Sequence, residues 1–225
     1  MFTKITLENF RSFDHIELDL TEKGNTAKHL AILYGENGAG KSNLMSAFVL
    51  LPELTRTMDA RAAYERILAQ GAIFQDENME KEMREHIRQR LRDMSAIIKD
   101  YQMADCENPI IAEYEFNIDG NNGCYRVEFG QDEILHERLE FVLNRRRGLY
   151  FDCSVTGINI NDSIVEKEQG KEFLTDVKEM AKRYWGKHSL LAILIYEMKD
   201  KSNSFGRDNI TENFNVVLNE FRNLS

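Results

Sequence analysis

Alternation of apolar and polar residues opens the chain and predicts two strands. In residues 3–10, Ile5 and Leu7 alternate with polar neighbours, and the same period of two returns in "HIELDL", residues 15–20. A period of two is typical of β-strands, because successive side chains point to opposite faces of a sheet. We therefore expect an antiparallel pair of strands at the start of the domain.

A continuous apolar run follows in "HLAILYG", residues 29–35. Such a run is typical of a central strand that is buried on both faces. After a glycine-rich stretch, residues 41–51 carry apolar side chains at helical spacing, and we expect Pro52 to end that helix because proline cannot continue it. The predicted local order is strand, glycine loop, helix.

The rest of the chain divides into helical and strand-like parts. Residues 53–104 have helical patterning with an interruption near Gly71, and residues 109–160 alternate as in an antiparallel meander, with "DGNNG" as a hairpin turn. Helical patterning resumes from residue 163 to 225. The expected fold class is α/β.

Composition narrows the class of protein. The chain has 225 residues, 42% of them hydrophobic, and no apolar run approaches the roughly 20 residues of a membrane-spanning helix. The first residues lack the apolar core of a secretory signal, so we expect a cytoplasmic protein without a membrane partner. The three cysteines predict neither a disulfide framework nor a zinc site. A net charge of −9 disfavours non-specific nucleic-acid binding, so any DNA contact requires a local basic patch.

The strongest motif is "GENGAGKS", residues 35–42, which matches the Walker A pattern G-x-x-x-x-G-K-[ST]. Glycines in this pattern let backbone N–H groups point at phosphate oxygens, and the following helix adds the positive end of its dipole. Lysine then reaches the β and γ phosphates, and the serine hydroxyl suits magnesium. We predict binding of ATP with magnesium, with Ser42 as a metal ligand, by Gly35, Asn37, Gly38, Ala39, Gly40, Lys41 and Ser42.

Hydrolysis needs an acidic residue as well, usually at the end of another apolar strand. The nearest candidate is Glu197 in "LLAILIYEMKD", but this segment fits a helix equally well, and no SGG-type signature loop occurs in the chain. The catalytic residues are therefore unknown at this point.

The pair "KITLENFRSFDHIELDL" and "GENGAGKSNLMSAF" resembles the N-terminal lobe of RecF/SMC-like ABC-type ATPases. The sequence pattern is most similar to that of prokaryotic RecF-like AAA ATPases of phage-defence and abortive-infection systems, some of which work with a nuclease. The resemblance implies a P-loop NTPase fold with a mixed sheet, and it places Arg11 near the nucleotide phosphates or DNA. It also implies dimerisation around nucleotide and a nuclease or effector partner.

That family takes its signature loop and Walker B carboxylates from a second lobe. We therefore expect residues 1–162 to form an ATP-binding lobe, with a helical insertion at 53–104 and the meander at 109–160. Residues 163–225 would form a helical segment leading to a missing C-terminal lobe. This chain alone is expected to bind ATP without efficient turnover.

Two other functions remain open. One is a self-contained P-loop small-molecule kinase, for which Arg145, Arg146 and Arg147 are the candidate lid arginines. The other is a nucleotide-gated scaffold without catalysis. Basic residues within 81–92 also suggest DNA, but interleaved acidic residues favour ion pairs along a helix. The five histidines lack metal-ligand spacing, so no further metal site is expected.

Overall fold

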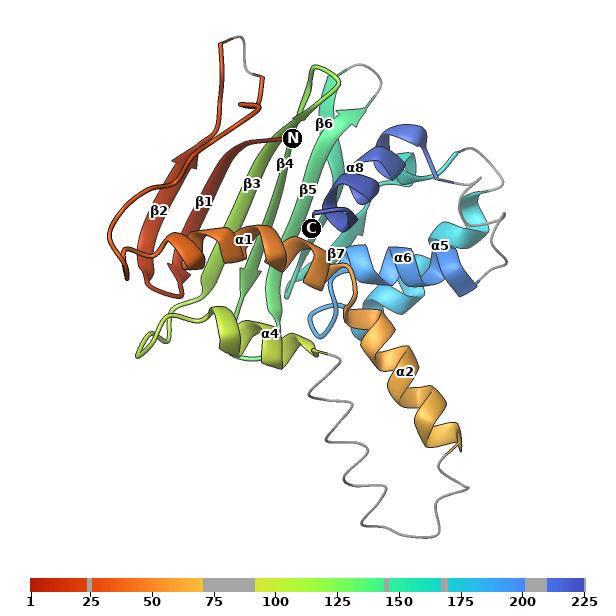
Figure 1. Ribbon diagram of the computed structural model, residues 1–225. Helices are drawn as coiled ribbons and strands as arrows, with labels where there is room; N and C mark the ends of the chain where they lie inside the picture. The colour runs from red at the N-terminus through yellow and green to blue at the C-terminus, as the bar shows by residue number, and fades with distance from the viewer. Residues whose placement is uncertain (24–25, 71–91, 144–145, 167–169, 201–209, 225) are drawn as a thin grey trace, which may run out of the picture.

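The architecture is one antiparallel sheet with helices packed against one face, as the computed structural model shows (Figure 1). The structure describes residues 1–225 except 24–25, 71–91, 144–145, 167–169, 201–209 and 225. The strands are β1 (Phe2–Phe10), β2 (Phe13–Asp19), β3 (Ile110–Ile118), β4 (Asn121–Phe129), β5 (Ile134–Leu143), β6 (Arg146–Ser154) and β7 (Gly157–Ile160). They pair in the order β2-β1-β3-β4-β5-β6-β7, with every neighbouring pair antiparallel.

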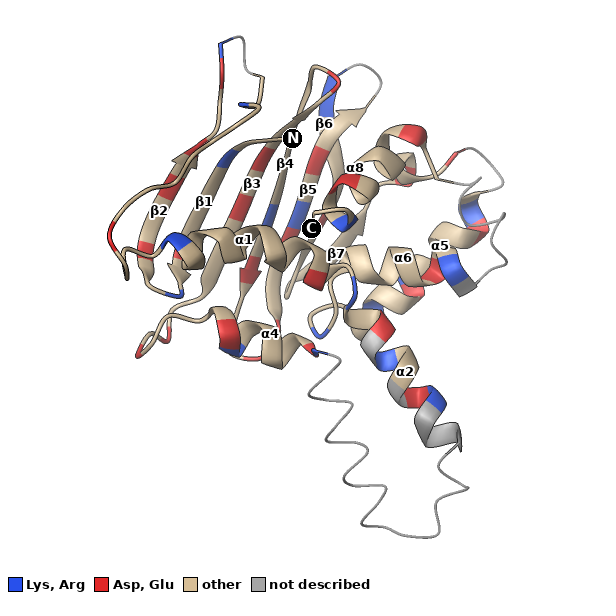
Figure 2. Cartoon of the chain, in the orientation of Figure 1, with Lys and Arg blue, Asp and Glu red and all other residues tan. Residues whose placement is uncertain are grey.

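The strand register separates an apolar face from a charged one. One row across β1 and β3 to β6 consists of Ile5, Tyr114, Tyr125, Leu139 and Phe151, all fully buried. The adjacent row, on the opposite face, consists of Thr6, Glu113, Arg126, Arg138 and Asp152. Figure 2 shows both signs of charge along the strands. Because side chains alternate along each strand, one face is apolar, and the described helices that contact the sheet, such as α1 and α8, pack on that face.

Helices supply the second layer. They are α1 (Lys41–Leu54), α2 (Thr57–Gln70), α4 (Met94–Tyr101), α5 (Gly170–Tyr184), α6 (Leu190–Asp200) and α8 (Glu212–Arg222), with a 3-10 turn, η2, at Asp162–Ile164. Buried residues from Ile5 to Phe221 form one continuous core. The phenol of Tyr114 donates to the backbone carbonyl of Ala47 at 2.7 Å, which fixes α1 to the middle of the sheet.

Most strand predictions are confirmed. The opening pair is β1 with β2, and the meander corresponds to β3 through β7. The "DGNNG" hairpin turns at Asp119 and Gly120, which have φ values of 51° and 78°. Two consecutive positive φ values are the signature of the tight turn whose twist matches antiparallel strands.

Two expectations about the sheet are wrong. It is not mixed, because the described residues contain no parallel strand pair in the sheet. The apolar run 29–35 does not form a central buried strand: it runs along the β2 edge toward α1 without a strand partner among the described residues (Figure 1). Apolar composition predicted burial of this run, but burial also requires a covering surface, and the described chain supplies none.

Pro52 does not end the first helix, which continues to Leu54. Proline removes only one backbone donor, and the next turn still closes through the Thr55 N–H, which donates to the Leu51 carbonyl at 3.2 Å. The helical prediction for 53–104 is confirmed in α2 and α4, whereas residues 92–93 and 102–104 are not helical. The interruption near Gly71 and the basic residues of 81–91 lie outside the described residues. The predicted boundary at residue 162 stays a prediction.

One buried carboxylate joins the sheet to the C-terminal helices. Glu137 of β5 is fully buried and accepts hydrogen bonds from the Tyr125 phenol, the Trp185 indole and the backbone N–H of Leu190, at 3.0, 2.9 and 2.7 Å. Burial, opposed in part by these donors, raises the pKa of Glu137 to about 7. Leu190 is the first residue of α6, so this side chain anchors the start of that helix. No described helix is long and apolar enough to cross a membrane.

Candidate functional site

The glycine loop at residues 35–42 lies between the exposed run and α1. Gly38 and Gly40 have φ values of 88° and 84°, a region that residues with a side chain rarely adopt. A Cβ atom at Gly40 would also lie 2.7 Å from the Phe13 ring, so that position has no room for a side chain. No atom lies within 4 Å of a Cβ atom at Gly38, which leaves an open approach to the loop backbone.

The start of α1 presents unpaired backbone donors. Gly40 is the N-cap and no side chain caps this end of the helix. The Leu44 N–H donates to the Gly40 carbonyl at 2.9 Å, so the earlier N–H groups of Lys41, Ser42 and Asn43 have no partner within the helix. The helix dipole concentrates partial positive charge at the same end. This combination is an anion site of the kind that phosphate groups occupy.

Lys41 folds back over the loop. Its ammonium donates to the backbone carbonyls of Gly35 and Glu36, at 2.8 and 2.7 Å. The positive charge is therefore already held at the mouth of the loop. A phosphate group would offer this ammonium a charged acceptor in place of neutral carbonyls, and charge-assisted hydrogen bonds are the stronger kind.

The structure brings seven of the predicted site residues together in this loop. Gly35, Asn37, Gly38, Ala39 and Ser42 are exposed, and Gly40 and Lys41 are half-buried. The remaining predicted residue is Arg11, which lies in the β1–β2 turn with its guanidinium carbon 5.0 Å from the centroid of the Tyr101 ring.

The loop offers one side-chain ligand for a magnesium ion. Ser42 offers a hydroxyl in the first turn of α1, directly after Lys41, and the phosphates themselves provide the other hard oxygen ligands that magnesium prefers. Ser42 would therefore hold the ion from the protein side, and the ion would neutralise phosphate charge when bound.

An exposed apolar surface adjoins the loop. We define the apolar patch as the large side chains of Leu30, Ile32, Leu33, Tyr34, Met45 and Val49, which are 37% to 92% exposed. A cavity lies beside Lys41 and Ser42 and is otherwise lined by Ala31, Leu33, Met45, Ser46, Phe48, Val49 and Leu224. No carboxylate is among these lining residues, so the part of the chain described here does not supply an acidic group at this place.

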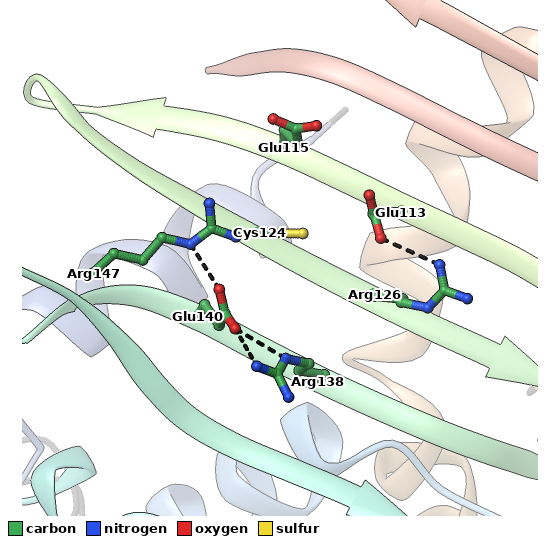
Figure 3. A pocket seen from close by; sticks show the side chains of 7 residues that line it. All are labelled: Glu113, Glu115, Cys124, Arg126, Arg138, Glu140 and Arg147. Atoms are coloured by element: carbon green, nitrogen blue, oxygen red, sulfur yellow. Dashed lines mark hydrogen bonds and ion pairs between the residues drawn. The ribbon is translucent and has the colours of Figure 1, made fainter.

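The charged face of the sheet carries a second cavity, which does not suit a nucleotide (Figure 3). It is lined by Glu113, Glu115, Cys124, Arg126, Arg138, Glu140 and Arg147. The arginines are paired within it: Arg126 donates to Glu113 at 3.2 Å, and Arg138 and Arg147 both donate to Glu140. Although burial opposes the effect, these two arginines lower the pKa of Glu140.

Other candidates from the sequence are not placed near the loop. Glu197 is buried within α6 and does not end a strand, and α6 packs against α2 and α5. Arg147 pairs with Glu140 at 2.7 Å on the charged face, whereas Arg145 lies outside the described residues. The cysteines are free thiols, and burial together with the nearby Glu113 charge raises the pKa of Cys124 to about 12.

Sequence analysis missed the residues that support the loop from behind. The Asn43 side chain donates to the Ser12 hydroxyl at 2.8 Å, and Phe13 fills the space beside Gly40. Ser12 lies in the β1–β2 turn and Phe13 is the first residue of β2, so both come about 30 positions earlier in the chain. The sequence shows only that "RSF", residues 11–13, lies between two predicted strands. That position does not indicate which residues the turn contacts.

Comparison with known proteins gives two findings. A family model described as AAA ATPase domain matches residues 1–217. The DNA replication and repair protein RecF of Bacillus mycoides (strain KBAB4) is 41% identical to this chain over 49 residues. That match covers 22% of this chain and 12% of the RecF chain, so it spans a small part of the length of that relative.

Proposed function

The chain belongs to the AAA ATPase domain family, and from that premise we propose that it is the ATP-binding lobe of a RecF/SMC-like ATPase. The observation that carries the proposal is the uncapped start of α1 behind a loop with two positive-φ glycines and Lys41 folded over its mouth. These features together suit the phosphate groups of a nucleoside triphosphate.

The chemistry assigned to these residues is binding and charge stabilisation. The N–H groups of Lys41, Ser42 and Asn43 would donate to phosphate oxygens, and the Lys41 ammonium would exchange its two carbonyl acceptors for the β and γ phosphates. Magnesium held by Ser42 would neutralise the remaining charge. Phosphoryl transfer also needs a group that orients the attacking water. No acidic residue lines the cavity beside the loop in the described part of the chain, so we propose that this group comes from elsewhere.

The apolar patch supports completion of the site by another segment or polypeptide. Ile32 and Tyr34 are 74% and 92% exposed, next to the loop that would hold the phosphates. Burial of a large apolar side chain is worth about 1.5–3 kcal/mol, so the six residues of the patch would favour a covering surface by roughly 10 kcal/mol before ordering costs. A segment that covers the patch would also reach the cavity beside Lys41 and Ser42.

The wider biological proposal rests on the resemblance. We propose a dimer or higher oligomer closed by nucleotide, which acts on DNA or on a nuclease or effector partner, with phage defence as one setting. The short match to RecF supports a link to DNA, since the name of that relative refers to DNA replication and repair. The net charge of −9 confines any DNA contact on this chain to a local basic patch.

A nucleotide-gated scaffold is the second candidate, and the lack of a lining carboxylate in the described cavity favours it. The small-molecule kinase is less well supported. Its candidate lid arginine Arg147 is on the sheet face opposite to α1 and is paired with Glu140. The sheet is also antiparallel throughout its described strands, whereas kinases of that kind are built mainly on parallel strands.

A single-turnover assay separates these functions. The chain is held in excess over ATP labelled at the γ-phosphate, and bound label, released phosphate and labelled small molecules are measured. We expect bound label without release, and loss of binding in Lys41→Ala. Lys187→Ala removes the same charge from an exposed side chain between α5 and α6 and serves as the matched control. Phosphate release by the isolated chain would contradict the need for completion, and transfer to a metabolite would support a kinase.

A further inference from the structure

The turn between β1 and β2 connects two elements that are far apart in sequence. On one side, Ser12 accepts a hydrogen bond from the Asn43 side chain at 2.8 Å, and the Phe13 ring packs beside Gly40. On the other side, the Arg11 N–H donates to the Tyr101 carbonyl at 2.8 Å. The turn is therefore held between the end of α4 and the glycine loop with the start of α1, which together are called the nucleotide loop below.

Arg11 is held in an uncommon geometry by this contact. Its φ is 53°, in the left-handed region that non-glycine residues seldom adopt. Its guanidinium stacks on Tyr101, and its Nε is buried with no hydrogen-bond partner among the described residues. Such a conformation persists only when surrounding contacts fix it. The Tyr101 ring and carbonyl are two such contacts, and the neighbouring Met103 N–H also donates to the Asn9 carbonyl at 3.2 Å.

Tyr101 is itself fixed at both ends of its side chain. The ring is 2% exposed and stacks on Phe10 with centroids 5.1 Å apart. Its phenol donates to Glu53 at 2.8 Å, and burial together with the Glu53 charge raises the pKa of Tyr101, so the phenol stays a donor. Glu53 also pairs with Arg92.

Glu53 closes a ring of contacts around α1. The helix begins at Lys41 in the nucleotide loop and carries Glu53 in its last turn. Its first turn binds the β1–β2 turn through Asn43, and its last turn binds the same turn through Glu53, Tyr101 and Arg11. A change at Tyr101 would therefore move the support of Gly40 without touching the loop.

We propose that Tyr101, held by Glu53, is a positioning residue for the nucleotide loop, and that Arg11 acts through the β1–β2 turn and not by touching the phosphates. This inference rests on the proposed nucleotide binding. Loss of the Tyr101 ring removes the surface under the Arg11 guanidinium but keeps the bond from the Arg11 N–H to the carbonyl of residue 101. The turn is then held less firmly, and so are Asn43 and Gly40, which Ser12 and Phe13 contact.

The test is a double-mutant cycle on nucleotide affinity in the full chain, with fluorescent ATP and ADP analogues as probes. Arg11→Ala and Tyr101→Leu are each expected to lower the affinity for ATP and for ADP by the same factor, about three- to tenfold. The double variant is expected to be no weaker than either single variant. Tyr101→Phe keeps the ring and loses only the bond to Glu53, so its effect is expected to be about twofold.

Tyr125→Phe is the matched control, because it removes a buried phenol-to-carboxylate hydrogen bond, that to Glu137, away from the loop. Its affinity should equal that of the wild type. Unchanged affinity in Tyr101→Leu would overturn the proposal. So would Arg11→Ala weakening ATP but not ADP, since that pattern indicates a direct phosphate contact.

Hydrogen exchange of peptides covering residues 38–48 gives a readout that does not require nucleotide. Faster exchange in Tyr101→Leu and Tyr101→Phe, but not in Tyr125→Phe, is expected if Tyr101 supports the loop. Unchanged exchange in the Tyr101 variants would overturn the positioning role. Absence of nucleotide binding by the wild type, with faster exchange in the Tyr101 variants, would refute the proposed function and leave the support of the loop intact.

Discussion

Glu137→Gln should change how the stability of this protein depends on pH. The pKa of Glu137 is about 7 in the folded chain against an ordinary value of 4.5, because its carboxylate is buried. The folded state thus binds a proton more readily than the unfolded state does. Stability from this group is complete below pH 4.5 and is lost as the pH rises to 7. At about 1.4 kcal/mol for each pH unit between the two values, the loss is about 3 kcal/mol.

His188 acts in the opposite direction over nearly the same range. Burial and the charge of Arg61 lower its pKa to about 4 from 6.5. The folded state resists protonation of this ring, so stability is lost as the pH falls from 6.5 to 4, by a similar or smaller amount given its partial exposure. His188 lies between α5 and α6, and the carboxylate of Glu137 in β5 accepts from Trp185 and Leu190 at the same place. We therefore expect the two effects largely to cancel in the wild type between pH 4.5 and 6.5.

Glu137→Gln removes one of these two opposing effects. Glutamine keeps an oxygen that accepts from Leu190 and Trp185, and its amide group can pair with Tyr125, so the packing is preserved. The stability of the variant should then rise with pH from 4.5 to 6.5. The free energy of unfolding of wild type minus variant should fall by about 3 kcal/mol between pH 4.5 and 7.

Urea titrations at several pH values, followed by the fluorescence of Trp185, measure this difference. Trp185 is the single tryptophan of the chain, and its indole donates to Glu137. Glu140→Gln is the control. The pKa of Glu140 is lowered in the folded chain, so its ionised carboxylate stabilises the fold, and this variant should lose that stability at pH values above the pKa. If the Glu137→Gln and wild-type curves run parallel across pH 4.5–7, the buried carboxylate is not ionising in this range and the reasoning is refuted.

Three further substitutions test other contacts. Gly40→Ala puts a side chain at a residue with left-handed backbone and against the Phe13 ring. Urea titration should therefore show a free energy of unfolding lower by about 1–3 kcal/mol, and calorimetry a weaker affinity for ATP. A variant as stable as the wild type would contradict the clash. Tyr114→Phe removes the buried hydrogen bond from the phenol to the Ala47 carbonyl and should lower the free energy of unfolding by about 1–2 kcal/mol in thermal unfolding. No change would mean that this bond does not contribute to stability. Ile32→Asp should change stability by less than about 0.5 kcal/mol because the side chain is 74% exposed, and a large loss in urea titration would show that the run is buried in solution.

The sequence was most informative where the evidence is local. Alternation with a period of two located β3 to β7, and the Asp119-Gly120 pair located the turn between β3 and β4, because both signals depend on neighbouring residues. The glycine loop was also predictable, since positive φ at Gly38 and Gly40 is a property of the residue type.

Contacts between distant residues were not predictable in the same way. The apolar run 29–35 predicted burial, but composition does not state which surface covers a run, and among the described residues none does. Tyr101 and Glu53 are 48 positions apart, and no periodic pattern links them to Arg11. The sequence placed Arg11 near the nucleotide by resemblance alone, whereas the structure places its guanidinium on Tyr101.

The central claim is that the loop at residues 35–42 binds the phosphates of a nucleotide, and titration calorimetry with magnesium-ATP tests it most directly. The account predicts saturable heat at one site in the wild type and in Lys187→Ala, and at least a tenfold loss of affinity in Lys41→Ala, whose ammonium is held over the loop. Absence of heat in the wild type, or equal affinity in the wild type and Lys41→Ala, would contradict it.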